Sequence, residues 1–109
     1  MRPVSVGTVL TQAAKTTVFK VPTGYYALWN MAYAVNHSGN NKYIDIIWYD
    51  VSTATEIDVI YHYVISPTQF IKFDGSYVVL EEGDEVRALT EAGSVMSVIN
   101  TFELFRNKG

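Results

Sequence analysis

The sequence predicts an all-β fold of about eight antiparallel strands, arranged as a sandwich or a barrel. Strand-forming residues dominate: phenylalanine, tryptophan and tyrosine make up 14% of the 109 residues, and eight residues are tyrosine. Side chains of different polarity alternate with a period of two in one run after another. Turn-forming residues separate these runs at regular intervals, which is typical of sandwiches and barrels.

The alternating runs place the strands along the whole chain. Within YYALWNMAYAV, for example, every second residue from Tyr25 falls on one face and every second residue from Tyr26 falls on the other. The one helix candidate is LTQAAK, which could form a single turn. The expected strands span roughly residues 5–10, 17–21, 25–36, 43–51, 57–65, 69–73 with 77–80, 85–90 and 95–105.

Turn chemistry accounts for the breaks between the strands. HSGNNK predicts a hairpin loop, because glycine and asparagine tolerate positive φ angles. Pro67 in SPTQ stops a strand because it cannot donate a ladder hydrogen bond. DGS predicts a tight turn within the seventies. The connections are expected at residues 37–42, 52–56, 66–69, 74–76, 81–85 and 91–94.

The acidic stretch LEEGDEV could be either a metal site or a turn. Its carboxylates flank Gly83 without the spacing of an EF-hand calcium loop. Neighbouring acids in a short turn mostly face solvent and do not converge on an ion. We therefore expect a turn whose acids keep the strand ends soluble, with a metal site as the alternative. The four acids are Glu81, Glu82, Asp84 and Glu85.

The sequence gives no support for catalysis or a cofactor. It has two histidines and no cysteine, so neither a disulfide framework nor a thiolate metal site can form. It contains no nucleophile elbow, no phosphate-binding glycine pattern and no closely spaced histidine pair. We expect a protein that is not an enzyme and holds neither a metal nor a cofactor.

Charge and hydropathy also exclude classes of partner. The net charge is −3 and the eight basic residues are scattered, whereas nucleic-acid binding needs a clustered basic surface. No apolar run is long enough for a membrane-spanning helix, and the N-terminus lacks the apolar core of a signal peptide. We expect one domain spanning residues 1–109, binding neither nucleic acid nor membrane.

Several strands are apolar or aromatic on both faces, which predicts self-association. A strand with one wet face usually alternates cleanly, yet YYALW, IIWY and YHYV do not. We expect another chain to cover these faces; the alternative is that tyrosine hydroxyls simply point to water. The residues expected to anchor this interface are Tyr25, Tyr26, Trp29, Trp48, Tyr61, His62 and Tyr63, with Phe102, Phe105 and Arg106 as further contacts.

Two further interactions follow from the same residues. Pro3 and its β-branched neighbours favour an extended N-terminal arm, residues 1–6, which could lie along a neighbouring chain. Exposed aromatic rings could instead stack on sugars, so a glycan-binding surface is an alternative to the protein interface. Its candidate residues are Trp29, Trp48, Tyr49, Tyr61 and Tyr63.

Two long segments resemble a recurrent pattern in small structural proteins of phage virions. TTVFKVPTGYYALWNMAYAVNHSGNN, residues 16–41, has a strand ending in V-P-x-G, a long strand and a Ser-Gly-Asn loop. FIKFDGSYVVLEEGDEVRALTEAGSVMSVINTFEL, residues 70–104, continues with V-L-E-x-G-D, a V-R-A strand and a final alternating strand. The resemblance covers about residues 8–104 and rests on turn motifs.

The resemblance implies an antiparallel, jelly-roll-like β-sandwich and a structural role. Such proteins decorate or cement capsids, commonly as trimers or larger rings, or serve as tail, collar or baseplate accessory subunits. The expected partners are other copies of the chain, with a trimer favoured, and the major capsid protein or other virion proteins. The expected location is the virion, after synthesis in the host cytoplasm.

Overall fold

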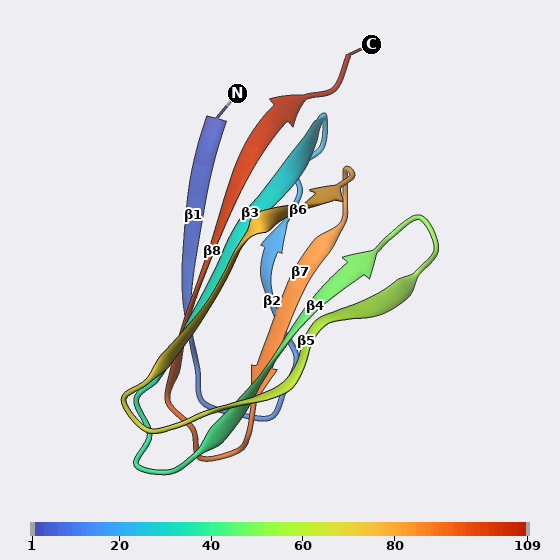
Figure 1. Cartoon of the computed structure of the whole chain (residues 1–109). Coiled ribbons are helices and arrows are strands. Elements are labelled where there is room, and N and C mark those ends of the chain that lie inside the picture. Colours follow the sequence, from blue (N-terminus) through green and yellow to red (C-terminus); the bar gives the residue numbers. More distant parts are fainter. Residues whose placement is uncertain (1, 109) are drawn as a thin grey trace.

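The computed structural model describes residues 2–108, and the side chains of all of these except 74–77. It confirms the predicted antiparallel β-sandwich (Figure 1). Sheet A has the strand order β1-β8-β3-β6 and sheet B has the order β2-β7-β4-β5. The eight strands of the described chain are β1 (Arg2–Leu10), β2 (Thr16–Lys20), β3 (Tyr25–Asn36), β4 (Lys42–Asp50), β5 (Thr55–Ile65), β6 (Phe70–Leu80), β7 (Glu85–Thr90) and β8 (Met96–Arg106).

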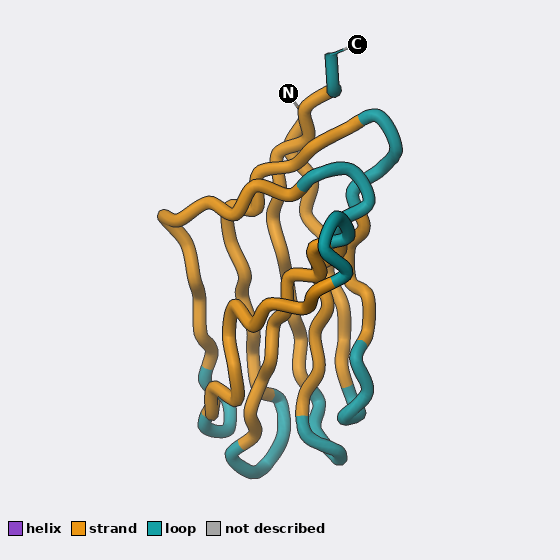
Figure 2. The backbone as a smooth tube through the Cα atoms, turned by 90° about the vertical axis from the view of Figure 1, so that its right-hand side faces the viewer, coloured by secondary structure: helices purple, strands orange, loops and turns teal. Residues whose placement is uncertain are grey.

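The chain crosses between the two sheets at almost every connection, which gives the sandwich its jelly-roll-like character. Only β4 and β5 form a hairpin within one sheet. The loop after β3, predicted as a hairpin loop, instead carries the chain from sheet A to sheet B. Figure 2 shows four of the connections gathered at one end of the sandwich, opposite the two termini.

Two local predictions need correction. DGS at 74–76 does not reverse the chain: β6 continues through it and pairs with β3 on both sides of a register shift opposite Trp29 and Met31; the side chains of 74–77 lie outside the described part. A bulge absorbs the turn-forming residues here. Residues 11–15 form bends and no helical turn. Residues 2–6 belong to β1 and pair along one side with β8 of the same chain. Because β1 is an edge strand, its other side is open, and the arm that lies along a neighbouring chain stays a prediction.

No helix that is long and apolar enough to cross a membrane occurs in residues 2–108.

The alternation seen in the sequence sorts side chains between the core and the outside. On β7, Val86, Ala88 and Thr90 are buried while the residues between them are partly exposed. Phe102 of β8 lies at the centre of the core, where its ring stacks 4.0 Å from that of Phe19. Large aromatic side chains contribute much of the burial energy of so small a domain.

Asp84 explains the acidic stretch. Its buried carboxylate accepts hydrogen bonds from the Trp48 indole at 3.1 Å, from the Val51 amide at 3.0 Å and from the Glu81 amide at 2.9 Å. It thereby ties the turn after β6 to the β4–β5 hairpin. Gly83 beside it has a φ of +85°, which favours glycine. The predicted turn is present, but one of its acids is an interior hydrogen-bond acceptor and does not face solvent.

Replacing this acceptor should destabilise the domain. In Asp84→Ala three buried or partly buried donors lose a charged acceptor, so we expect the free energy of unfolding to fall by about 3 kcal/mol. Chemical denaturation followed by tryptophan fluorescence measures the change. Glu81→Ala is the matched control, because only the backbone of Glu81 takes part and its exposed side chain should be dispensable. Equal losses in the two variants would contradict this role.

Candidate interface at the open edge of the sandwich

The outer face of sheet B is closed by charged side chains of the chain itself. Arg87 on β7 pairs with Glu56 on β5 at 2.7 Å and with Glu85 at 3.1 Å, and its guanidinium lies 4.0 Å from the centre of the Tyr49 ring. Lys15 also pairs with Glu56, at 2.5 Å. This ion-pair network gives the β7 side of the face a solvated, polar covering. At the β5 edge of the same face, Tyr61 and Val64 are exposed beside Tyr43.

The network perturbs the acids and the base that form it. The hydrogen bond from Lys15, together with that from Arg87, lowers the pKa of Glu56. The Thr17 hydroxyl, followed by Arg87, lowers the pKa of Glu85. The hydrogen bond to Glu56 raises the pKa of Arg87 further. All of these shifts favour the charged forms, so the network is intact at neutral pH.

Apolar side chains are exposed along β5 and β6. These are the edge strands of the two sheets on the same side of the sandwich (Figure 1). Ile57 and Tyr63 of β5 pair with inward-facing residues of β4, yet both are exposed. Tyr63 contacts Phe73 of β6 edge-on, with ring centres 6.0 Å apart. Side chains that point toward the core are uncovered here, so we call this side the open edge.

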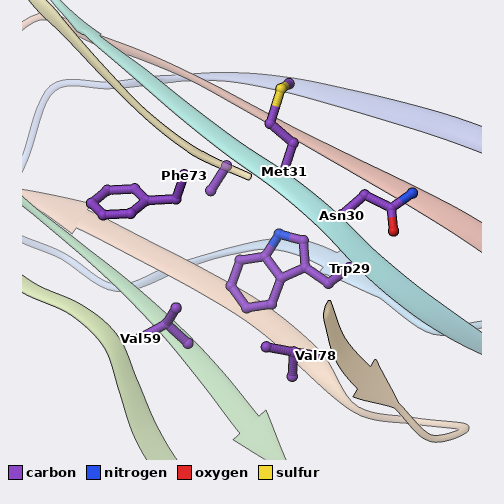
Figure 3. Close-up of a pocket in the computed structure, with 7 residues that line it drawn as sticks. Trp29, Asn30, Met31, Val59, Phe73 and Val78 are labelled. Carbon is purple, nitrogen blue, oxygen red and sulfur yellow. The ribbon is translucent and has the colours of Figure 1, made fainter. Parts of the chain in front are cut away.

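A cleft of about 180 Å³ lies between the sheets at the open edge. Its lining combines β3, β5 and β6, and Figure 3 shows the Trp29 ring among Val59, Phe73 and Val78. The Trp29 indole donates to Asn100 at 3.1 Å, which fixes the orientation of the ring. The cleft is therefore largely apolar and has one rigid wall. Its lining residues are Trp29, Asn30, Met31, Ala32, Val59, Phe73 and Val78.

β5 departs from regular strand geometry where it borders the cleft. Its pairing with β4 shifts register twice, around residues 59 and 61–62. His62 has a φ of 48°, an unfavourable value for a non-glycine residue inside a strand. The buried carboxylate of Asp45 holds this conformation, accepting from the His62 amide at 2.5 Å and bonding to its ring Nδ1 at 2.7 Å. Such bulges hinder the addition of another strand to a sheet edge.

The apolar surface at the open edge is large for a domain of this size. We define the open-edge patch as six residues that are each about 40–65% exposed. With ~200 Å² for a fully exposed aromatic side chain and somewhat less for an aliphatic one, the patch presents roughly 500 Å². A standard interface buries about 800 Å² per partner, of which roughly 60% is apolar. The patch comprises Ile57, Val59, Tyr63 and Phe73 on the inner side of the edge, and Tyr61 and Val64 on the adjoining outer face of sheet B.

The structure divides the predicted anchors into three groups. Phe102 is fully buried and Trp29 nearly so, which makes them core residues and not exposed anchors. Trp48 also packs against the core and donates to Asp84. At the C-terminal end, each ring or cation has a partner within the chain, as in the stacking of Tyr26 on Phe105 and the contact of Tyr25 with Arg106. The open edge brings together Tyr61, His62 and Tyr63.

Sequence reasoning missed part of this site. Val59, Val64 and Phe73 belong to the patch, and Asp45 holds the bulge, but none was singled out. Alternation marks which residues share a face and cannot show that one face lacks a covering sheet. A carboxylate among apolar residues in YIDIIWY was the available signal for Asp45, because a buried charge requires a partner.

Among the described residues, two further groupings bear on catalysis and metal binding. His37 and Ser97 approach to 3.0 Å through the ring Nε2 and the hydroxyl, but both are on the surface and no carboxylate in the described contacts orients the imidazole. In the described part of the chain, no three His, Asp or Glu side chains are placed to hold a metal ion. Trp29 is buried and Trp48 is partly buried against the core, which makes them weaker candidates for sugar stacking than an exposed ring.

No protein-family model and no curated protein matches the chain. Solved structures with a similar fold include a Bacillus endospore-appendage protein that forms disulfide-linked pili (14% identity, 98% of this chain and 90% of that one, TM-score 0.53). The nucleoplasmin-like domain of Drosophila FKBP39 is another (10%, 98% and 94%, 0.56). A pentameric capsid protein from metagenomic phage sequences matches at 19% identity over 87% of this chain and 59% of that one, with a TM-score of 0.43. At these identities, the first two structures show a shared fold alone.

The ion-pair network should make stability depend on pH in the acid range. Because the pKa values of Glu56 and Glu85 are lowered on folding, their contribution is present above the usual carboxyl pKa of 4.5 and is lost as pH falls through the folded values. Arg87→Gln should therefore melt at a temperature that falls less steeply with acidification. Differential scanning fluorimetry from pH 7 to 3 measures this, with Lys108→Gln as a control that keeps the wild-type slope. Equal slopes for all three proteins would refute the coupling.

Proposed function

We propose that the chain is a non-enzymatic structural protein of a phage virion, most simply a capsid decoration or cement protein. It acts by forming a homo-oligomer and by contacting the major capsid protein. The observation that carries this proposal is the open-edge patch, whose apolar area matches that of one side of a standard protein interface. The proposed location is the virion, with synthesis in the host cytoplasm.

The two outer sides of the sandwich favour this arrangement. The ion-pair network keeps the β7 side of the outer face of sheet B in solvent, whereas the open edge exposes aromatic and β-branched side chains that gain free energy on burial. The chain has no cysteine, so its copies cannot be joined by disulfides as the pili are. Repeated weak contacts on a particle surface add up through avidity.

The phage assignment rests on the two sequence segments that resemble small virion proteins, residues 16–41 and 70–104. A tail, collar or baseplate accessory subunit would use the same fold and the same patch, and it differs only in the partner surface. A glycan-binding role has less support, because Trp29 and Trp48 are turned into the domain and Tyr49 already lies against Arg87.

Binding to particles tests the proposal. The wild-type protein should bind empty capsids of the phage that encodes it and raise their melting temperature. Tyr63→Asp places a charge in the centre of the open-edge patch and should abolish both effects while leaving the fold intact. Val9→Asp is the matched control, because Val9 is 64% exposed on β1, away from the open edge, and should behave as wild type.

Different outcomes separate the candidate functions. Binding to purified tails or baseplates and not to capsids would move the assignment to the accessory subunits. A specific signal on a polysaccharide array, with no binding to either particle, would remove the virion proposal.

A further inference from the structure

We propose that Tyr61 is the anchor of the self-association contact and that its ring enters the cleft of a second copy of the chain. This inference rests on the proposed homo-oligomer and names the residues that would make it. Tyr61 is 65% exposed, more than any other large apolar residue of the described chain. Tyrosine is also among the residue types most enriched at the energetic centres of interfaces.

The surroundings of Tyr61 hold its ring in place before any partner arrives. The Tyr61 ring stacks on that of His62 with centres 4.0 Å apart, and the His62 ring stacks on Tyr43 at the same distance. Tyr43 lies on β4, one strand further into the sheet. An exposed side chain that is already ordered loses less conformational entropy on binding, which strengthens the contact.

Two contacts from Asp45 fix the backbone beneath this stack of rings. The buried carboxylate of Asp45 accepts a hydrogen bond from the backbone amide of His62 and bonds to the ring Nδ1 of the same residue. His62 itself adopts a positive φ. A strained residue that is held by a buried acid points to a functional constraint. Here the constraint positions the neighbouring Tyr61.

The cleft provides a socket of suitable size and chemistry. An apolar cavity of about 150 Å³ accepts a benzene ring, and the cleft measures about 180 Å³ with the Trp29 ring as its fixed wall (Figure 3). A tyrosine can bury its ring among Val59, Phe73 and Val78 while its hydroxyl stays at the wet rim. The amphipathic side chain thus fits a cleft that is open on one side.

The occupant is a second copy because every chain carries both parts. Val59 lines the cleft and lies only two residues before Tyr61. The anchoring ring and part of the cleft therefore belong to the same edge strand, β5. In a closed ring or a two-fold dimer, each copy can place its Tyr61 ring in the cleft of another copy. No ring and no cleft is then left without a partner. The open-edge patch surrounding both parts supplies the apolar area that such a contact needs.

Sedimentation velocity over a concentration series tests the anchor. Tyr61→Ala should weaken self-association by at least about 30-fold, the effect of a hot-spot residue, without changing the melting temperature of the monomer. Tyr61→Phe keeps the ring and should associate nearly as well as wild type. His62→Gly tolerates the positive φ but removes the stack, and should weaken association while the domain remains folded. Val9→Ala, at almost equal exposure, is the control and should have no effect.

Cysteine pairing gives a direct test of position, because the chain has no cysteine of its own. Mixed Tyr61→Cys and Phe73→Cys proteins should form a disulfide-linked heterodimer under mild oxidation, and Tyr61→Cys mixed with Val9→Cys should not. If the wild-type protein self-associates but Tyr61→Ala matches Val9→Ala, the anchor is wrong and the proposed function stands. If the wild-type protein is a monomer that binds neither itself nor capsids, both fail.

Discussion

The structure depends on one geometric constraint: two four-stranded sheets that face each other leave β5 and β6 uncovered on the same side. Side chains there point toward the interior, as alternation requires, but are only partly covered by the facing strand, as in the edge-on contact of Tyr63 with Phe73. Ile57, Val59 and Tyr63 are therefore oriented as core residues and yet exposed. The cleft beside Trp29 and the apolar patch around it are both consequences of this incomplete closure.

Buried polar side chains fix the loops around this framework. Asp84 joins the turn after β6 to the β4–β5 hairpin through three hydrogen bonds. Asn36 does the same at the other end, donating to the carbonyls of Asn40 and Ile65. Asp45 differs from both, because it does not bond to a loop between strands. It bonds to His62, a strained residue within an edge strand. That difference is the reason to treat the His62 bulge as part of a binding surface.

The sequence was sufficient for the strands, because a period of two and turn chemistry are local properties. These properties left a sandwich and a barrel open, and the resemblance to small virion proteins is what favoured the sandwich. The sequence wrongly predicted a tight turn at DGS, since a bulge and a turn use the same residue types. Only the pairing of β6 with β3 before and after DGS distinguishes the two. It also grouped Trp29 and Phe102 with Tyr61 as anchors. All three are aromatic residues in alternating strands, and only the position of the facing sheet determines which of them are buried. The outcome for Tyr61, His62 and Tyr63 as interface residues awaits measurement.

The central claim is that the open edge is covered by another copy of the chain in solution. Its most direct test is the molar mass of the wild-type protein, determined by light scattering coupled to size-exclusion chromatography across a range of loading concentrations. We predict a mass that is a whole multiple of the 12.2 kDa chain and that falls toward one chain only on strong dilution. A monodisperse species of one chain at every concentration would contradict the claim.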